Sequence, residues 1–600
     1  MNEPRSRGGF WRALPWALFL LTLLVACAIV GWPYRHHLRS DEALWRAAQE
    51  ATGDEAAALY ALLDERIPEL GSYWLLWSAQ ARLPHPNAVA DLVAAAQARP
   101  DSPVAFEAYV ALARYYAGIE SPQTVTAYQE ALKLDDRADT RLELARYLEE
   151  QRATAGAYRQ YITLLGSARP DAFVGMRRTA PDALTLARDL LARGYRTDVL
   201  DALHGVEACD ADCLRAQALV GLGRGDEAVP YQQACAACTA TPTPTPASAE
   251  PDAAATEEPA PTETEEPTEP LPLDSDDPID WWSYTWSLEE DGQLDLALET
   301  YLRIAATDAY VNDDAAYRAY VLANRQRDMA ARDAALARLT ALQPNWLAYR
   351  ATGTLRYQPA ADFPPQAMEE LAGPLLGIVT ALEALGRDDL ALAELRFAGR
   401  VSEIPEVLLA VAQAFDERGQ PRLAWSLAAS ELRDHPYAPL GTWQLAYPRV
   451  WEELALEAAA RQNIDPALLW AIMRQESAYD PDAVSYVGAR GLMQFMPATQ
   501  QQMAESAGRV YVPGDAFVPA AAIDMGARYL RFLTDLYGER ADLVVMAYNA
   551  GPGAVNQWLD DPQIQDEDDM LRFAWYGETR EYMTRVLLDR ELYRQVWAVE

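Results

Sequence analysis

One glutamate near the C-terminus, Glu476, has a position that suits acid chemistry. Asp465 can cap the start of a helix, and Pro466 suits its first turn because a missing N–H loses no partner there. The apolar residues that follow at helical spacing are Leu469, Ile472 and Met473. Glu476 lies on the same face. Burial of a carboxyl group raises its pKa, which is the property that a general acid needs near neutral pH.

A structural role is the alternative for Glu476. A buried glutamate can be paired with an arginine, such as Arg490, and do no chemistry. The sequence of this helix alone does not distinguish a catalytic from a structural Glu476. The motifs that follow are needed to distinguish them.

Four further sequence blocks follow the glutamate in a fixed order. They are Gly491-Leu492-Met493-Gln494, Met496-Pro497, Ala547-Tyr548-Asn549-Ala550-Gly551-Pro552-Gly553 and Glu578-Thr579-Arg580-Glu581-Tyr582. With Glu476-Ser477 before them, they resemble the catalytic domain of the soluble lytic transglycosylases, lysozyme-like enzymes that cut the glycan strands of peptidoglycan. The resemblance covers about residues 447–600 and implies a lysozyme-like α domain.

The resemblance also implies roles for single residues. Glu476 would be the catalytic residue, and the substrate-binding residues would be Ser485, Gln494, Met496, Tyr548, Asn549 and Glu578. The family's Ser-Pro-Val-Gly block reads Ser485-Tyr486-Val487-Gly488 here, so a tyrosine replaces the proline. Glu578 would orient the neighbourhood of the catalytic residue through Tyr548. Structural alternatives are a core position for Met496, a favourable helix N-terminal charge for Glu578 and a simple C-cap turn for Gly551–Gly553.

The implied reaction uses one carboxyl group twice. Protonated Glu476 would donate to the glycosidic oxygen between N-acetylmuramic acid and N-acetylglucosamine, and the acetamido group would assist its departure. The carboxylate would then take the proton of the C6 hydroxyl, which closes a 1,6-anhydro ring. Asp480 and Asp482 lie in a polar turn and are not placed as a second acid. No metal and no cofactor is expected.

Length and charge limit the other classes of function. Six hundred residues exceed one hydrophobic core, so several domains or a repeat array are expected. The net charge of −38 argues against nucleic acid as a partner, because phosphate binding needs basic surface.

The N-terminal segment, residues 1–33, is expected to be an export signal or membrane anchor. Three arginines precede an apolar run from Ala13 to Trp32. Cys27 ends a sequence that resembles a lipoprotein cleavage box, but the apolar run continues past it, which favours an uncleaved transmembrane helix. The body of the protein would then lie in the bacterial cell envelope, outside the cytoplasm and tethered to the cytoplasmic membrane.

Most of the remaining chain is predicted to be all-α. Residues 34–238 and 281–446 alternate polar turns with amphipathic helices at intervals of tetratricopeptide-like hairpins. The fold class is therefore a tetratricopeptide-like α-solenoid in two parts, followed by the lysozyme-like domain; an irregular helical domain is the alternative. Residues 239–280, acidic and rich in proline and threonine, are expected to be a disordered linker.

Four cysteines cluster near the end of the first solenoid part: Cys209, Cys213, Cys235 and Cys238. Outside the cytoplasm such a set most often forms disulfides, and nested Cys213–Cys235 and Cys209–Cys238 bridges fit a helical hairpin. The connectivity stays open, and a four-thiolate zinc site is the alternative.

The expected function is cleavage of peptidoglycan with formation of 1,6-anhydromuramic acid ends. One alternative is a hydrolytic muramidase, which would need a second carboxyl group to activate water. The other is a membrane-tethered scaffold that binds glycan without cutting it and binds protein partners on its solenoid.

Overall fold

The computed structural model describes residues 40–598 with short gaps. The gaps are 168–169, 240–277, 308–311, 342–343, 356, 486, 563, 565 and 574–576. The predicted anchor and the predicted linker, apart from its ends, lie outside the described residues. Within them, the regular elements are helices with a few isolated β-bridges, and no described helix is long and apolar enough to cross a membrane.

The chain forms two compact units, residues 1–262 with 374–397 and residues 263–373 with 398–600. The helices of the first unit are α2 (Asp41–Glu50), α3 (Gly53–Arg66), η1 (Pro68–Leu70), α4 (Gly71–Arg82), α5 (Pro86–Ala98), α6 (Pro103–Gly118), α7 (Gln123–Leu134), α8 (Ala138–Glu150), α9 (Thr154–Thr163), η2 (Leu164–Ser167), α10 (Pro170–Thr179), α11 (Ala183–Ala192), α12 (Arg196–Ala202), α13 (Cys209–Gly221) and α14 (Gly225–Thr239). The unit boundaries fall within α20 (Pro365–Ala384) and α21 (Asp388–Val401).

The helices that lie within the second unit are α15 (Pro278–Glu290), α16 (Leu294–Ala305), α17 (Asn312–Gln326), α18 (Met329–Ala341), α19 (Trp346–Thr352), α22 (Pro405–Glu417), α23 (Pro421–Asp434), α24 (Leu440–Ala446), α25 (Glu452–Gln462), α26 (Pro466–Ser477), α27 (Pro497–Ser506), η3 (Pro513–Phe517), α28 (Pro519–Tyr537), α29 (Ala541–Ala550), α30 (Pro552–Leu559), α31 (Glu567–Phe573) and α32 (Gly577–Trp597).

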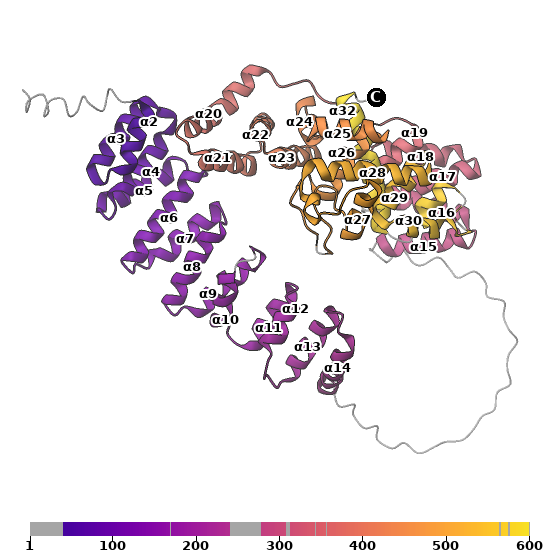
Figure 1. Ribbon diagram of the computed structural model, residues 1–600, viewed down its shortest axis with the longest axis horizontal. Coiled ribbons are helices and arrows are strands. Elements are labelled where there is room, and N and C mark those ends of the chain that lie inside the picture. Colours follow the sequence, from indigo (N-terminus) through magenta and orange to yellow (C-terminus); the bar gives the residue numbers. More distant parts are fainter. Residues whose placement is uncertain are drawn as a thin grey trace, which may run out of the picture. The chain divides into compact units, whose positions relative to one another are not determined.

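The first unit is a stack of helical hairpins, as the repeat pattern predicted. Each helix from α2 to α9 packs on the next one in sequence, as Figure 1 shows in purple, and so do α11 to α14. Several of these helices end at a turn that holds a left-handed residue: Glu120 (φ 51°), Arg152 (φ 56°), Gly194 (φ 83°) and Gly223 (φ 73°). A residue with positive φ stops the helical hydrogen-bond pattern and lets the chain reverse.

A buried carboxylate attaches the later helix α21 to the first repeats. Glu394 accepts a hydrogen bond from Tyr73 Oη (2.7 Å) and pairs with the Arg99 guanidinium (2.7 and 2.9 Å). Its side chain is almost completely buried, so loss of either partner would leave a buried charge uncompensated. This long-range contact has no signature in the hairpin pattern.

One predicted disulfide is formed. Cys213 of α13 is bonded to Cys235 of α14, across the open end of one hairpin. These two sulfurs therefore cannot serve as thiolate ligands, which removes half of the alternative zinc site. The side chain of Cys238 lies outside the described residues, so the Cys209–Cys238 bridge stays a prediction.

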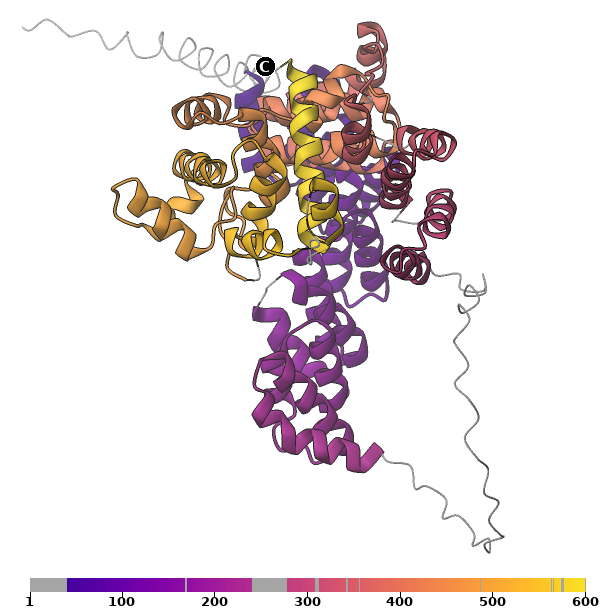
Figure 2. The same ribbon diagram turned by 90° about the vertical axis from the view of Figure 1, so that its right-hand side faces the viewer.

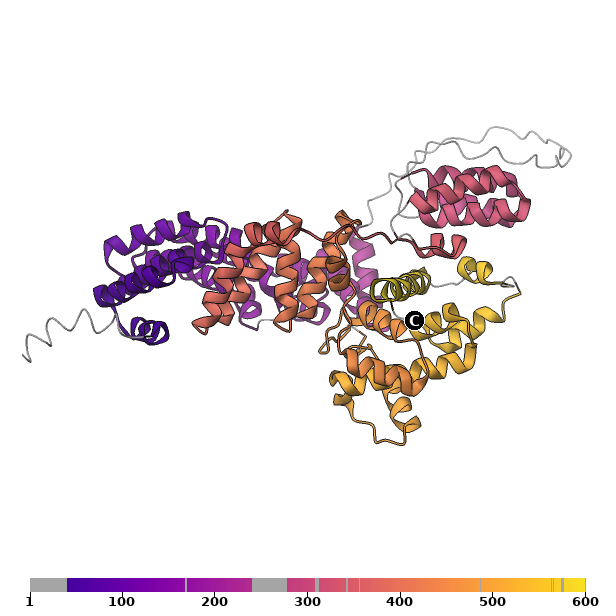
Figure 3. The same cartoon turned by 90° about the horizontal axis from the view of Figure 1, so that it is seen from above.

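The second unit begins with a short set of repeats. Helices α15 to α18 pack in sequence order, and Figure 3 shows them in pink, side by side. Their core includes Tyr301, Leu322 and Leu339. The fold class predicted from the sequence, a helical solenoid before a lysozyme-like α domain, is confirmed.

The C-terminal domain forms around α26 and α32, which is the long yellow helix in Figure 2. Trp470, Ile472 and Met473 of α26 are completely buried. The sequence suggested one apolar face, but α26 is buried nearly all round, because helices and loops surround it. Helices α27, α28 and α29 end just before Gly508, Gly538 and Gly551.

A glycine allows the loop after α26 to approach its neighbour closely. Gly491 has φ +69°, and a Cβ there would lie 1.7 Å from the carbonyl oxygen of Ala516. Only glycine fits both the left-handed backbone and this contact.

Replacing Gly491 by alanine should therefore destabilise the C-terminal domain strongly. Left-handed strain costs about 1–2 kcal/mol, and overpacking against backbone adds about 1–3 kcal/mol. The matched control is Gly508→Ala, where φ is +65° but nothing lies within 4 Å, so only the first cost applies. Scanning calorimetry of the full chain should show a clearly larger fall in Tm for Gly491→Ala. Equal falls would contradict the packing argument.

Candidate active site

Glu476 lies in the last turn of α26, where the helix ends abruptly. Ala478 (φ 50°) and Tyr479 (φ 62°) are both left-handed, and Tyr479 is buried. Glu476 Oε1 accepts a hydrogen bond of 2.6 Å from Tyr582 Oη of α32. Its side chain is half-buried. The carboxyl group thus combines an apolar environment with one hydroxyl donor.

Burial sets the protonation of this carboxyl group. It raises the pKa of Glu476 from 4.5 to about 7, and the Tyr582 hydrogen bond opposes the rise because it stabilises the charged form. Among the described residues no ion pair is formed to Glu476, so the alternative of a core pair with Arg490 is not observed. A carboxyl group of this kind is present in both protonation states near neutral pH.

The loop after α26, α29 and α32 are joined by hydrogen bonds around the end of α26. The Ser477 hydroxyl lies 2.9 Å from the Leu492 carbonyl oxygen, which joins the end of α26 to the following loop. Tyr548 Oη of α29 donates to the Met493 carbonyl oxygen at 3.0 Å. The charge of Glu476 contributes to a raised pKa of both Tyr548 and Tyr582, after burial, so both phenols stay protonated and can donate.

The loop residues predicted to bind substrate lie in a tight hydrogen-bonded turn. Gln494, which has φ 47°, donates from Nε2 to the carbonyl oxygens of Gly491 (2.8 Å) and Ala483 (3.2 Å). Ser485 Oγ accepts from the Ala489 N–H at 3.0 Å. Met496 is 43% exposed and is therefore not the core residue that its structural alternative required.

The helix α32 starts beside the end of α29. Thr579 Oγ1 donates to Asn549 Oδ1 at 2.6 Å, which holds Asn549 at the end of α29. Glu578 is exposed at the first turn of α32. The hydrogen bond of Tyr548 goes to Met493 instead, and the residue of this block that contacts Glu476 is Tyr582.

Sequence reasoning missed the residues that hold α26 against α32. Asp465 caps α26 through Oδ1 (2.9 Å to the Ala467 N–H) and pairs through Oδ2 with Arg590 and with Arg594 (2.7 Å). The cap was predictable from the sequence, and the ion pairs were not.

A second ion pair lies further along the same two helices. Arg474 pairs with the buried Asp589 at 2.8 Å, and its guanidinium lies 4.6 Å from the centre of the Tyr447 ring. In the sequence, the only sign of this ion pair was the presence of acids and arginines along α32. Such charges on a helix are usually solvated.

The nearby aspartates have structural tasks. Asp480 accepts from the Asp482 N–H at 3.0 Å and forms an ion pair with Arg422. The described residues contain no group of acids, histidines or cysteines arranged to hold a metal ion. Glu476 is thus the acid that the surrounding elements enclose.

The comparisons with known proteins agree on the C-terminal domain. Residues 453–571 match the family model "Transglycosylase SLT domain". Similar proteins include the soluble lytic murein transglycosylases of Salmonella typhimurium (33% identical over 151 residues, 25% of this chain and 23% of the relative) and of Escherichia coli K12 (28% over 243 residues, 40% and 37%). The matched segments therefore span well under two thirds of these relatives.

The solved structure of the 70 kDa soluble lytic transglycosylase of Escherichia coli has the same fold over most of the chain. The match covers 92% of this chain and 96% of that one, with a TM-score of 0.51 and 18% identity. Tyr582 lies beyond the residues matched by the family model. Residues 453–571 therefore belong to the transglycosylase SLT domain family, and the chain has the fold of the 70 kDa soluble lytic transglycosylase.

Proposed function

We propose that this protein is a peptidoglycan lytic transglycosylase that cleaves the bond between N-acetylmuramic acid and N-acetylglucosamine and forms 1,6-anhydromuramic acid ends. The observation that carries the proposal is the enclosed acid Glu476, with a pKa of about 7 and a phenol donor at 2.6 Å. The similar proteins are named for murein, which supports the same substrate class. The cell envelope is the corresponding location.

In the first step Glu476 acts as the acid. Its protonated carboxyl donates to the glycosidic oxygen, and the bond from that oxygen to C1 of N-acetylmuramic acid breaks. The positive charge at C1 is taken up by the carbonyl oxygen of the neighbouring acetamido group. Since Asp480 is engaged by Arg422, substrate assistance replaces the second carboxylate of an ordinary glycosidase.

In the second step the same residue acts as the base. The Glu476 carboxylate accepts the proton of the C6 hydroxyl, whose oxygen bonds to C1 and displaces the acetamido oxygen. Tyr582 holds the carboxyl oxygen in place through both steps. A pKa near 7 suits a group that must give and then take a proton.

The substrate-binding roles remain proposals at this site. Ser485 would hold the acetamido group, and Gln494 and Met496 would line the saccharide groove. Tyr548 would hydrogen-bond near the reacting centre, Asn549 would shape the turn, and Glu578 would orient the neighbourhood.

The roles of the segments before the C-terminal domain are also proposals. Residues 1–33 would tether the protein to the cytoplasmic membrane, and residues 239–280 would be a flexible linker between the solenoid parts 34–238 and 281–446. Protein partners would bind on the solenoid, whose stacked hairpins offer extended surface.

Replacing Glu476 by glutamine should abolish turnover and keep glycan binding. The loss expected for a general acid–base group is about 10²–10⁴-fold. The measurement is mass spectrometry of the products released from purified peptidoglycan, with Asp480→Asn as the matched control that keeps activity. Ordinary reducing ends, or an equal loss in Asp480→Asn, would instead indicate a hydrolytic muramidase. Binding without fragments from the unmodified protein would indicate a scaffold.

The activity should fall as the pH rises through about 7. The pKa of Glu476 is raised in the folded protein, so the acid form that starts the reaction is lost above that value. Tyr582→Phe removes the donor that stabilises the carboxylate, so the pKa of Glu476 should rise. The fall in activity on the alkaline side of the pH profile (the alkaline limb) should then move to higher pH. The pH dependence of initial rates measures both effects, with the exposed Tyr437→Phe as a control that leaves the limb in place. A limb moving to lower pH would contradict the role of the phenol.

A further inference from the structure

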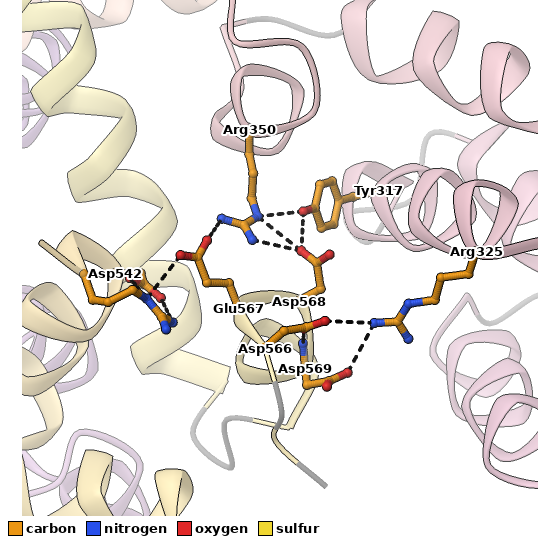
Figure 4. A network of polar contacts seen from close by, with 9 residues as sticks. Tyr317, Arg325, Arg350, Asp542, Asp566, Glu567, Asp568 and Asp569 are labelled. Carbon is orange, nitrogen blue, oxygen red and sulfur yellow. Dashed lines mark hydrogen bonds and ion pairs between the residues drawn. The ribbon is translucent and has the colours of Figure 1, made fainter. Parts of the chain in front are cut away.

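The short helix α31 (Glu567–Phe573) is held by basic side chains from other elements. Four acids stand in a row at its start: Asp566, Glu567, Asp568 and Asp569. Arg350 of the repeat helix α19 lies between Glu567 and Asp568, as Figure 4 shows, with its Nη2 atom 3.0 Å from Asp568 Oδ1. Arg540, just before α29, pairs with Glu567 at 3.2 Å.

This helix depends on those contacts. Seven residues are too few for a stable isolated helix, and four adjacent acids repel one another. A favourable helix dipole compensates for part of this repulsion. The arginines therefore supply the stabilising charge that the segment itself lacks, and all of them come from other elements.

Among the ion pairs that hold α31, the one between Arg350 and Asp568 is well shielded from solvent. The Arg350 and Asp568 side chains are 22% and 26% exposed. Tyr317 Oη of α17 donates to Asp568 at 2.7 Å and accepts from Arg350 Nε at 2.7 Å. The pairs of Arg325 with Asp566 and Asp569, at 3.4 and 3.5 Å, are longer and more exposed, so they contribute little.

The repeat helix α19 also packs directly against α32. The charges of Arg580 and Glu581 on α32 and of Asp313 act on Asp314 of α17. The Glu591 carboxylate of α32 acts in the same way on Tyr349 of α19. Leu571 of α31 packs against the repeat core and against the core of the C-terminal domain.

Arg580 lies two residues before Tyr582, the donor to Glu476. Tyr582 from α32 and Tyr548 from α29 are the titratable groups that face Glu476. The position of the first turns of α32 therefore sets the hydrogen bond that tunes the catalytic acid.

We propose that Arg350, with Tyr317 and Asp568, forms a clamp through which the repeat helices α17 and α19 position α32 and its Tyr582 against Glu476. Arg350 is a positioning residue, since it acts through α31 and α32 and does not touch the reacting atoms. The repeat segment is thus a part of the catalytic unit in addition to any role as a binding surface. This inference rests on the proposed function of Glu476.

The clamp has a measurable consequence for the protonation of Glu476. When α32 is held less firmly, the Tyr582 hydrogen bond lengthens and stabilises the carboxylate less. The pKa of Glu476 then rises, and the alkaline limb of the activity moves to higher pH, in the same direction as for Tyr582→Phe. A simple loss of folded protein would lower the rate equally at every pH and leave the limb in place.

The test uses Arg350→Gln and Asp568→Asn in the full chain, with Arg332→Gln as the matched control. Arg332 pairs with its neighbour Asp333 on α18 of the same repeats. Release of glycan fragments is followed from pH 5 to 9, and hydrogen exchange is measured over the start of α32. Each clamp variant should lose about tenfold in rate near neutral pH, which corresponds to about 1.4 kcal/mol, and should show the upward shift and faster exchange at α32.

An unmoved limb with unchanged exchange in a folded clamp variant would overturn the inference. Asp568→Asn keeps the shape of the side chain, so it serves if Arg350→Gln does not fold. Absence of fragments from the unmodified protein would instead refute the proposed function, and the exchange data would still report whether the clamp holds α32.

Discussion

The C-terminal domain depends on the antiparallel pairing of α26 with α32. Asp465 meets Arg590 and Arg594 at one end, Arg474 meets Asp589 in the middle, and Glu476 meets Tyr582 at the other end. A buried ion pair adds little net stability, because desolvation cancels most of the attraction. It does select one register, since any shift of the helices would leave the buried Asp589 unpaired.

This register supports the proposed one-acid site. For the proposed reaction, Glu476 must be shielded enough from water to hold a proton near neutral pH and must still reach substrate. The left-handed residues that end α26 place it at the edge of the core, where burial raises its pKa and Tyr582 limits the rise. The GLMQ loop is fastened on the other side by Ser477 and Tyr548. Each element around the acid thus contributes a hydrogen bond or excludes water.

The helical repeats make two kinds of contact, local contacts within the hairpins and long-range contacts to distant segments. Their hairpins are built from contacts between neighbours in sequence, which is why a short periodic pattern suffices to predict them. Their long-range contacts follow no such pattern. Glu394 attaches α21 to α4 and α5 in the first unit, and in the second unit Arg350 and Tyr317 attach α17 and α19 to α31.

The sequence by itself determined the fold class, and it indicated Glu476 as the acid of the proposed reaction. These features follow from local periodicity, from backbone conformations that few residues tolerate, and from motifs of fixed spacing. The sequence suggested disulfides at the cysteine cluster but left their connectivity open; the structure shows the Cys213–Cys235 bridge across one hairpin.

Only the tertiary structure decided which side chains meet across distant segments. Tyr582, not Glu578, is the residue of its block that contacts Glu476, and Asp465 and Arg474 find their partners on α32, over a hundred residues away. A charged residue on a helix surface has the same sequence signature whether it is solvated or paired. The difference is made by packing, which removes water from some charges and leaves others exposed.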